Sequence, residues 1–308
     1  MKVSIIGGGG RVGSNAAFAL QCAGIVSEIH LLDANEQMAQ GEALDLLHGT
    51  SVIGDQTIYA GGYEKCADAD LICITAGLRR KPDESRLDLI NRNVSLFRQI
   101  LDSIKSAGLK KDAIIFVVSN PVDILTRLAI DAMKYDPTRV IGLGTQLDTA
   151  RFRSLIAVET GLPASQIKAL ILGEHGDSMV PIWSSATAAG MPLVKLPNFN
   201  ATVQAKVFDR AKTSGAECIK LKGGAGWAVG LTIAEVIHAI ALNQPKVLPV
   251  SSQLTGEYGI RNTCTSLPTL INSRGVGKRY EIDLWPREVS ALQAGAKQLD
   301  ATYAQVQK

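Results

Sequence analysis

The residues best suited to chemistry lie in a Gly-Glu-His-Gly-Asp segment at positions 173–177, directly after an apolar run. Near neutral pH, the imidazole of His175 can accept or release a proton. Upstream, the carboxylate of Asp148 could orient this imidazole, and the forked guanidinium of Arg151, three residues later, could hold a carboxylate. A lone histidine is more often structural, and an i,i+3 pair is common in helices. The three residue types together predict proton transfer on an acid substrate.

A second set of residues has the pattern of a dinucleotide site. Positions 7–13 form a Gly-Gly-Gly-Gly-Arg-Val-Gly loop between an expected strand and an expected helix. The glycines fit both a Gly8-x-Gly10-x-x-Gly13 and a Gly7-x-x-Gly10-x-x-Gly13 spacing. Glycines permit a tight turn and a close approach of backbone amides to a pyrophosphate, which the helix N-terminus also attracts. The loop and its position predict a bound dinucleotide.

Asp33 ends the next expected strand, about 20 residues beyond the loop. A carboxylate there accepts hydrogen bonds from the adenosine ribose and repels a 2′-phosphate, which favours NAD over NADP. The alternative is that Asp33 only caps a turn with Asn35. A strand, a glycine loop, a helix and an acid in the correct order favour the cofactor interpretation.

Hydride transfer to a nicotinamide from a hydroxy acid also needs a donor at the reacting oxygen and exclusion of water. Asn120 follows a buried run, and its amide could contact substrate or cofactor; an Asn-Pro pair also makes a simple turn, and the two interpretations stay open. Arg80 and Arg86 lie in a polar stretch at 78–86. Such a stretch is usually a solvated loop, but here it could be a lid that brings charge to the substrate.

Composition excludes several classes of function. The chain has 308 residues, 46% of them hydrophobic and 20% charged, with a net charge of +3, which favours neither nucleic acid nor an anionic membrane as partner. Five scattered cysteines without a CxxC spacing predict reduced thiols rather than disulfides or a metal site. The chain opens on an expected strand, which predicts no signal peptide and a cytoplasmic location. The most apolar long stretch, 229–242, is too short to span a bilayer.

Alternating apolar runs and helical patterns predict the fold. The expected strands of the first half are 3–7, 28–33, 71–75, 114–119 and 140–144, and its expected helices include 13–22 and 86–106. Buried strands separated by helices predict an α/β fold with a Rossmann-type doubly wound parallel sheet. The second half, with expected helices at 147–158, 202–221, 225–242 and 287–307 and strands at 167–172 and within 246–271, predicts an α+β catalytic domain. We expect an NAD-binding domain over 1–144 and a catalytic domain over 145–308.

These segments together resemble the L-lactate/L-malate dehydrogenase family almost from end to end. The resemblance is carried by 2–13, 33, 75–77, 85–89, 92–93, 119–123, 147–152 and 173–177. It implies that His175 is the proton acceptor and donor, with Asp148 as its partner. It also implies that Arg151 binds the C1 carboxylate, that Arg86 polarises the carbonyl, and that Asn120 touches substrate and cofactor.

The resemblance further implies a cofactor site and an assembly. The cofactor-binding residues would be Gly7, Gly8, Gly10, Arg11, Val12, Gly13, Asp33, Asn93, Val118 and Asn120. The family resemblance also implies a homo-oligomer, a tetramer or a dimer, with a small-molecule substrate and no metal.

Within the family, three features favour the malate branch. Arg80 stands where malate enzymes carry arginine, which can pair with the second carboxylate of oxaloacetate or malate. Ala225 leaves room for a longer substrate, and the glycine spacing is typical of malate enzymes. The expectation is therefore an NAD-dependent malate dehydrogenase of the tricarboxylic acid cycle. Acids at Asp83 and Glu84 are typical of lactate enzymes, so the alternative is an L-lactate or broad-specificity L-2-hydroxyacid dehydrogenase. A cofactor-binding protein without enzymatic activity would not need the histidine and its partners.

Overall fold

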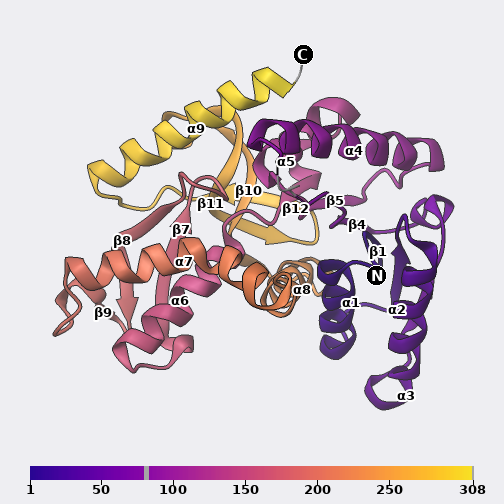
Figure 1. Cartoon of the computed structure of the whole chain (residues 1–308), viewed down its shortest axis with the longest axis horizontal. Coiled ribbons are helices and arrows are strands. Elements are labelled where there is room, and N and C mark those ends of the chain that lie inside the picture. Colours follow the sequence, from indigo (N-terminus) through magenta and orange to yellow (C-terminus); the bar gives the residue numbers. More distant parts are fainter. Residues whose placement is uncertain (80–82, 307–308) are drawn as a thin grey trace.

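The computed structural model describes residues 1–79 and 83–306 and contains two β-sheets (Figure 1). The larger sheet has nine strands in the order β12-β11-β10-β6-β5-β4-β1-β2-β3, and the smaller has three, in the order β7-β8-β9. The six strands from β3 to β6 pair in parallel, and the order 3-2-1-4-5-6 is that of a doubly wound dinucleotide-binding sheet. The predicted Rossmann-type sheet is confirmed.

The parallel strands are short and apolar because both of their faces are covered. Their bounds are β1 Lys2–Ile6, β2 Glu28–Leu32, β3 Thr57–Ala60, β4 Leu71–Ile74, β5 Ile114–Val117 and β6 Val140–Gly142. On one face, Val3 and Ile5 pack in a cluster with side chains of α1, α2 and α8. On the other face, Ile72 and Ile74 pack in a cluster with side chains of α4 and α5. This two-sided burial explains the continuous apolar runs from which the strands were predicted.

Helices cover the parallel sheet on both sides (Figure 1). They are α1 Arg11–Ala23, α2 Glu36–His48, α3 Thr50–Ile53, α4 Arg86–Ala107 and α5 Val122–Met133. The helix α1 begins after Gly10 and ends at Gly24, which adopts the left-handed conformation (φ +64°) that suits a glycine C-cap. Ser85 caps α4, accepting a hydrogen bond on its hydroxyl from the Asp88 amide.

The second half of the chain extends the large sheet and adds the small one. Its elements are α6 Gln146–Thr160, β7 Ile167–Leu172, β8 Val180–Ala188, β9 Met191–Pro192, α7 Ala201–Lys222, α8 Trp227–Ala241, β10 Lys246–Thr255, β11 Arg261–Asn272, β12 Gly275–Arg279 and α9 Pro286–Val306. Strands β10, β11 and β12 are antiparallel, and Ser251 of β10 pairs with Gly142 of β6. The large sheet therefore runs on past residue 144. Within the described residues, none of the helices is both long and apolar enough to cross a membrane.

Most predicted elements are confirmed within a few residues, and the omissions have physical causes. The helices α2, α3 and α5 were not predicted, nor were the strands β3, β8, β9 and β12. The face of α2 is broken by the exposed Leu44 and Leu47, and β3 has only four residues, of which Ile58 alone is buried. Such elements are held by their neighbours in the fold more than by their own pattern.

Candidate active site

The candidate site lies at the carboxyl ends of the parallel strands, where loops after β1, β4 and β5 meet the loop that joins β7 to β8. We call this last segment, residues 173–179, the histidine loop. Ligands bind at such an edge in open α/β sheets.

The glycine loop after β1 is shaped by backbone contacts too close for any side chain. Gly7 has φ +91°, and a Cβ on it would lie 2.6 Å from the Ala76 amide nitrogen. A Cβ on Gly13 would lie 2.2 Å from the Gly7 carbonyl oxygen. The Gly8 amide donates to the Leu32 carbonyl oxygen at 2.9 Å, which ties the loop to the end of β2.

The loop delivers the N-terminus of α1 without a side-chain cap, since Gly10 offers none. The first amides of a helix have no intrahelical acceptor and favour an anion such as a pyrophosphate. Arg11, the exposed first residue of α1, reaches toward the turn before α8, where a Cβ on Gly223 would lie 3.6 Å from its Nη2. Val12 is half-buried against the core cluster under α1. A dinucleotide phosphate fits this cradle.

Asp33 holds the loop from the side of β2. Its Oδ2 accepts a hydrogen bond from the Gly9 amide at 3.1 Å, and its Oδ1 accepts one from the Asn35 amide at 3.0 Å. The turn with Asn35 is therefore present. The two functions do not exclude each other, because a carboxylate has lone pairs for further donors such as ribose hydroxyls.

Two more predicted cofactor residues lie in α4 and directly after β5. Asn93, buried in α4, accepts a hydrogen bond on its side-chain oxygen from the Leu78 amide at 2.8 Å and so braces the segment after β4. Val118 follows β5, is half-buried, and donates its amide to Ile74. Both lie near the edge where the glycine loop opens.

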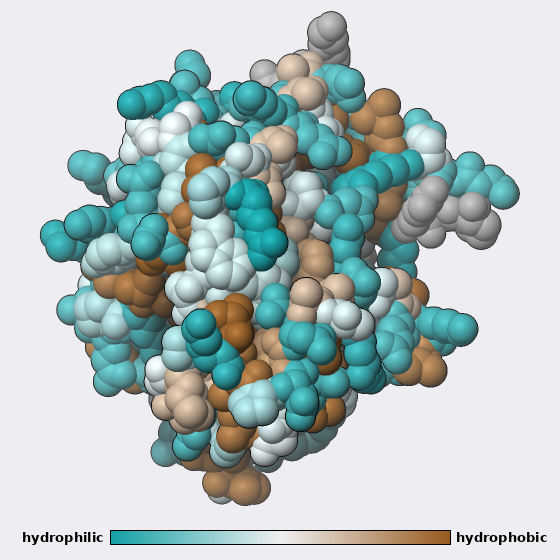
Figure 2. Space-filling model, turned by 90° about the vertical axis from the view of Figure 1, so that its left-hand side faces the viewer, coloured by the Kyte–Doolittle hydropathy of each residue, from teal (hydrophilic) through white to brown (hydrophobic). Residues whose placement is uncertain are grey.

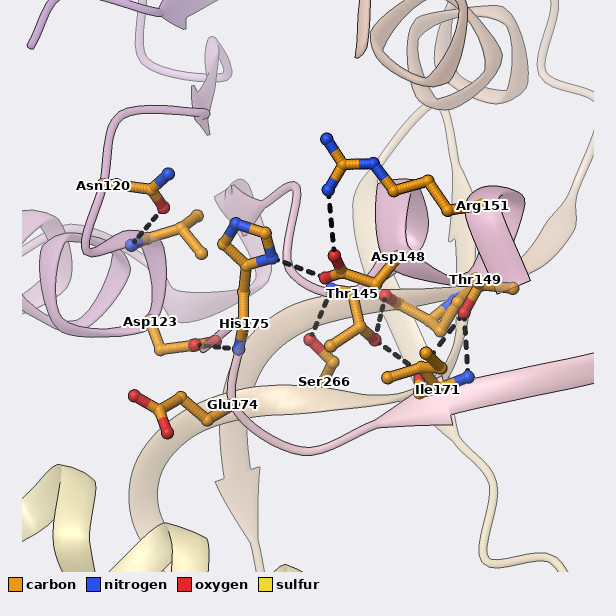
Figure 3. Close-up of polar contacts among 12 residues, drawn as sticks. Asn120, Asp123, Thr145, Asp148, Thr149, Arg151, Ile171, Glu174, His175 and Ser266 are labelled. Carbon is orange, nitrogen blue, oxygen red and sulfur yellow. Dashed lines mark hydrogen bonds and ion pairs between the residues drawn. The ribbon is translucent and has the colours of Figure 1, made fainter. Parts of the chain in front are cut away.

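The predicted pair of His175 and Asp148 is formed (Figure 3). The His175 Nδ1 lies 2.5 Å from the Asp148 Oδ2. The carboxylate is 1% exposed and the imidazole 22% exposed, so one face of the imidazole stays open to a ligand. Asp148 comes from the first turn of α6 and His175 from the histidine loop, 27 residues later.

Threonine hydroxyls fix the two elements that carry this pair. The Thr145 hydroxyl donates to the Ile171 carbonyl oxygen at 2.5 Å, and the Thr149 hydroxyl accepts from the Ile171 amide at 3.0 Å. The N-terminal turn of α6 is thereby bonded to the end of β7, just before the histidine (Figure 3). These buried contacts hold the helix that carries Asp148 against the strand that leads into the histidine loop.

The charges around the imidazole favour its protonated form. Burial by itself lowers the pKa of His175, but the carboxylates of Asp148 and then Asp123 outweigh burial, and the pKa is raised above its ordinary value. Burial also works against ionisation of Asp148, yet His175 and Arg151 hold the pKa of that carboxyl below its ordinary value. An imidazole placed in this way can both accept a proton and keep it.

Arg151 joins the pair from one turn along α6. Its Nη1 lies 3.4 Å from the Asp148 Oδ1, and its side chain is 15% exposed. In Figure 3 the guanidinium extends from α6 above Asp148, on the same side as the imidazole. The i,i+3 ion pair is therefore real, and it places a cation beside the histidine.

Asn120 and Arg86 are placed differently from each other. The Asn120 side-chain oxygen accepts a hydrogen bond from the Val122 amide at 3.3 Å at the start of α5, and the residue is exposed. Arg86 is drawn onto the histidine loop, where its guanidinium pairs with Asp177 and lies 3.7 Å from the Glu174 carboxylate. Arg80, one of the three features behind the malate expectation, lies outside the described residues.

Asp123 is a functional candidate that the sequence analysis missed. It is 3% exposed, and its Oδ2 accepts a hydrogen bond from the backbone amide of His175 at 2.8 Å. Burial raises the pKa of this carboxyl to about 6. The only signal in the sequence was an aspartate three residues after Asn120, in the first turn of an unpredicted helix. Among residues 1–79 and 83–306, no group of three His, Cys, Asp or Glu side chains is arranged to hold a metal ion.

Comparison with known proteins gives two family matches. The NAD binding domain of lactate/malate dehydrogenase matches residues 1–142, and the alpha/beta C-terminal domain of lactate/malate dehydrogenase matches residues 145–308. The family match establishes NAD as the cofactor of this oxidoreductase, as predicted.

The similar proteins are lactate enzymes. The chain is 37% identical to an L-lactate dehydrogenase of Acetivibrio thermocellus over 97% of this chain and 95% of the relative, and 38% identical to one of Treponema denticola over 99% and 98%. It superposes on a minor L-lactate dehydrogenase from Enterococcus mundtii with a TM-score of 0.93 at 36% identity, covering 99% and 98% of the two chains. A lactate dehydrogenase from a Medee basin deep-sea metagenome gives 0.94 at 32% identity, covering 100% and 99%.

These relatives overturn the expectation of a malate dehydrogenase of the tricarboxylic acid cycle. That expectation rested on Arg80, on Ala225 and on the glycine spacing, and the relatives show that these features do not identify a malate enzyme here. The charge that a substrate meets is a sum over the site, and acidic side chains at Glu174 and Asp177 lie against Arg86. The presence of one arginine therefore does not show that the substrate carries a second carboxylate. The whole chain, matched over both of its halves, belongs to the lactate/malate dehydrogenase family.

Proposed function

We propose that the protein is an NAD-dependent L-lactate dehydrogenase, which interconverts L-lactate and pyruvate. The observation that carries this proposal is the buried contact of 2.5 Å between His175 and Asp148, with Arg151 beside it. This arrangement supplies a proton carrier and a carboxylate-binding cation at one place. The names of the relatives, matched over nearly the whole chain, support lactate as the substrate.

In this proposal, His175 holds the proton that moves. Asp148 binds Nδ1, so Nε2 is the nitrogen that faces the ligand and accepts the hydroxyl proton of lactate. In the opposite direction the imidazolium donates that proton to the oxygen of pyruvate. The raised pKa of His175 stabilises the imidazolium before that donation. NAD, when bound, accepts or returns the hydride at the adjacent carbon.

The cations would bind and polarise the substrate. Arg151 can place two parallel N–H groups on the C1 carboxylate, which fixes the acid in one orientation next to the imidazole. Arg86 can polarise the carbonyl, and Asn120 can donate its amide to substrate or cofactor. The apolar methyl group of pyruvate needs no charge partner.

The cofactor half of the site has proposed roles of the same kind. The glycines at 7, 8, 10 and 13, with Arg11 and Val12, would seat the pyrophosphate on α1. Asp33 would bind the adenosine ribose, and Asn93, Val118 and Asn120 would line the nicotinamide side. The Asp33 carboxylate supports a preference for NAD over NADP.

We also propose a division near Gly144, with domains over 1–144 and 145–308. The two family matches end and begin close to this residue, which supports the proposal. Gly144 has φ +55°, and a Cβ on it would lie 2.2 Å from the Ser266 hydroxyl oxygen. The backbone there turns from β6 into α6 in a space that admits only glycine.

A homo-oligomer, a tetramer or a dimer, remains the proposed assembly. It is supported by large apolar side chains exposed on neighbouring helices: Phe18, Met38, Leu44, Leu47, Val52, Ile53, Trp227 and Leu231. They lie on α1, α2, α3 and α8. By contrast, Figure 2 shows hydrophilic residues spread over the opposite side of the molecule, with smaller groups of hydrophobic ones between them. Exposed apolar side chains gathered on adjoining helices are typical of association surfaces.

The decisive experiment is the rate of NADH oxidation with pyruvate and with oxaloacetate over a range of concentrations, repeated with NADPH. We expect pyruvate to give the higher kcat/KM and NADPH to be a poor substitute. Failure of the protein to oxidise NADH with any 2-oxoacid would contradict the proposal.

A further inference from the structure

Two acidic side chains of the histidine loop hold the guanidinium of Arg86. Its Nη1 forms an ion pair with the Asp177 carboxylate, and its Nη2 lies 3.7 Å from the Glu174 Oε1. Arg86 is the first residue of α4 and its side chain is 57% exposed, whereas that of Glu174 is 13% exposed. An exposed arginine is thereby held at the loop that carries His175. The ion pair joins Arg86 to Asp177, which lies 91 positions later in the sequence.

The Glu174 carboxylate and the backbone of Asp177 are held by contacts that do not depend on Arg86, while the Asp177 side chain itself is 70% exposed. The second oxygen of Glu174 accepts hydrogen bonds from the backbone amide of Ser178, at 3.2 Å, and from its hydroxyl. The backbone carbonyl of Asp177 accepts a hydrogen bond from the Lys212 Nζ at 2.7 Å. At Gly176, a Cβ would lie 2.7 Å from the Glu174 Oε1, so the glycine leaves room for that carboxylate. The loop is built to present this acidic pair.

Neither acid is a partner of the imidazole. The His175 Nδ1 is bonded to Asp148, and in Figure 3 the Glu174 side chain points away from the imidazole. The acidic pair therefore has another use. Glu174 immediately precedes His175, and Asp177 follows it by two positions. A cation bound by these two acids is therefore kept next to the residue that moves the proton.

We propose that Asp177 and Glu174 are positioning residues that keep Arg86 at the histidine loop, ready for the carbonyl of the 2-oxoacid. This inference rests on the proposed function. A free arginine side chain loses much rotamer freedom when it is ordered on a ligand, and prior ordering removes most of that cost from the binding step. The carbonyl of the substrate then binds a guanidinium that already lies nearby.

A double-mutant cycle tests this role. The variants are Asp177→Asn, Arg86→Ala and both together, and the quantity is kcat/KM for pyruvate. We expect Asp177→Asn to lower kcat/KM by about twofold to fivefold in the wild-type background, the size expected of an exposed ion pair. In the Arg86→Ala background, the same substitution should have no effect. The difference in kcat/KM between the wild type and Asp177→Asn should become smaller at high ionic strength, because salt screens an exposed ion pair.

A matched control neutralises another carboxylate. Glu159→Gln removes an acid near the C-terminal end of α6 that pairs with Lys206 at 2.9 Å, and it should leave kcat/KM unchanged. NADH affinity and the thermal unfolding midpoint of Asp177→Asn should match those of the wild type. An equal loss in both backgrounds, or no loss in either, overturns the positioning role while leaving the proposed function intact. A wild-type enzyme without activity on pyruvate overturns both.

Discussion

The two halves of the candidate site are made in different ways. The cofactor half is made of backbone: a loop at residues 7–13 whose contacts leave no room for a Cβ at Gly7 or Gly13. The substrate half is made of side chains from α4, α6 and the histidine loop, which come within bonding distance only in the fold. A backbone cradle is local in sequence, whereas a side-chain site depends on tertiary packing. The two halves should therefore fail separately when mutated.

The halves also differ in what holds them. The glycine loop is stabilised by shape and by backbone hydrogen bonds such as that from Gly8 to Leu32. The histidine is held by charge, between the buried carboxylates of Asp148 and Asp123. Charge responds to pH and to single-atom substitutions, whereas shape responds to added atoms. The following predictions use this difference.

The largest effect is expected from His175→Ala, which removes the proton carrier and leaves the glycine loop untouched. We expect kcat with pyruvate to fall by roughly 10²–10⁴-fold, the usual contribution of general acid–base catalysis. The dissociation constant of NADH, measured by fluorescence titration, should stay within about twofold of the wild type, because binding the cofactor needs no proton transfer.

The control for this prediction is His48→Ala, at an exposed position on α2. This substitution should alter neither kcat with pyruvate nor the dissociation constant of NADH. If His175→Ala weakened NADH binding as strongly as it lowered kcat, the two halves would not be separable and the comparison would be wrong.

An intermediate effect is expected from Gly13→Ala, which adds one carbon to the backbone cradle. Its Cβ would lie 2.2 Å from the Gly7 carbonyl oxygen, so the loop must move. We expect NADH affinity to fall by roughly tenfold to hundredfold, the equivalent of about 1.4–3 kcal/mol. Gly41→Ala is the matched control, because a Cβ there meets no atom within 4 Å. Unchanged NADH affinity in the Gly13 variant would show that the close contact is not needed.

The smallest effect is expected from Asp123→Asn, which keeps an oxygen for the His175 amide but removes a buried charge. Burial raises the pKa of Asp123 to about 6, above the value of about 3.9 for an unfolded chain. From about pH 4 to about 6, the folded wild type thus binds more protons than the unfolded chain, and its stability falls as pH rises. The free energy of unfolding of the wild type, relative to the variant, should therefore decrease over that interval and level off above it.

Urea unfolding at a series of pH values measures this difference. The same substitution should lower the apparent pKa of His175 in the pH profile of pyruvate reduction, because one of the two carboxylates that raise it is gone. A difference in stability that is constant from pH 4 to 7 would contradict the assignment.

The sequence predicted the cofactor half well because its information is local. The loop at 7–13, the strand before it and the helix after it are neighbours, and Asp33 follows on the adjacent strand. The pairing of His175 with Asp148 was also predicted, since their residue types in a known motif leave few other functions. The parallel sheet followed from apolar runs that burial on both faces requires.

Other features depend on tertiary contacts and were not predicted. Asp123 contacts the backbone of His175 across 52 positions, and no local pattern encodes that contact. The ion pair of Arg86 with Asp177 joins residues 91 positions apart. The choice of malate was wrong because it assigned specificity to Arg80, Ala225 and the glycine spacing taken singly, whereas the substrate meets the charges of several elements together.

The most direct measurement of the central claim is a crystal structure of the protein with NADH and oxamate, an unreactive isostere of pyruvate. The account predicts that the oxamate carboxylate binds Arg151 and that its carbonyl oxygen lies within hydrogen-bond distance of the His175 Nε2. Oxamate bound elsewhere, with the imidazole of His175 turned away from it, would contradict the account.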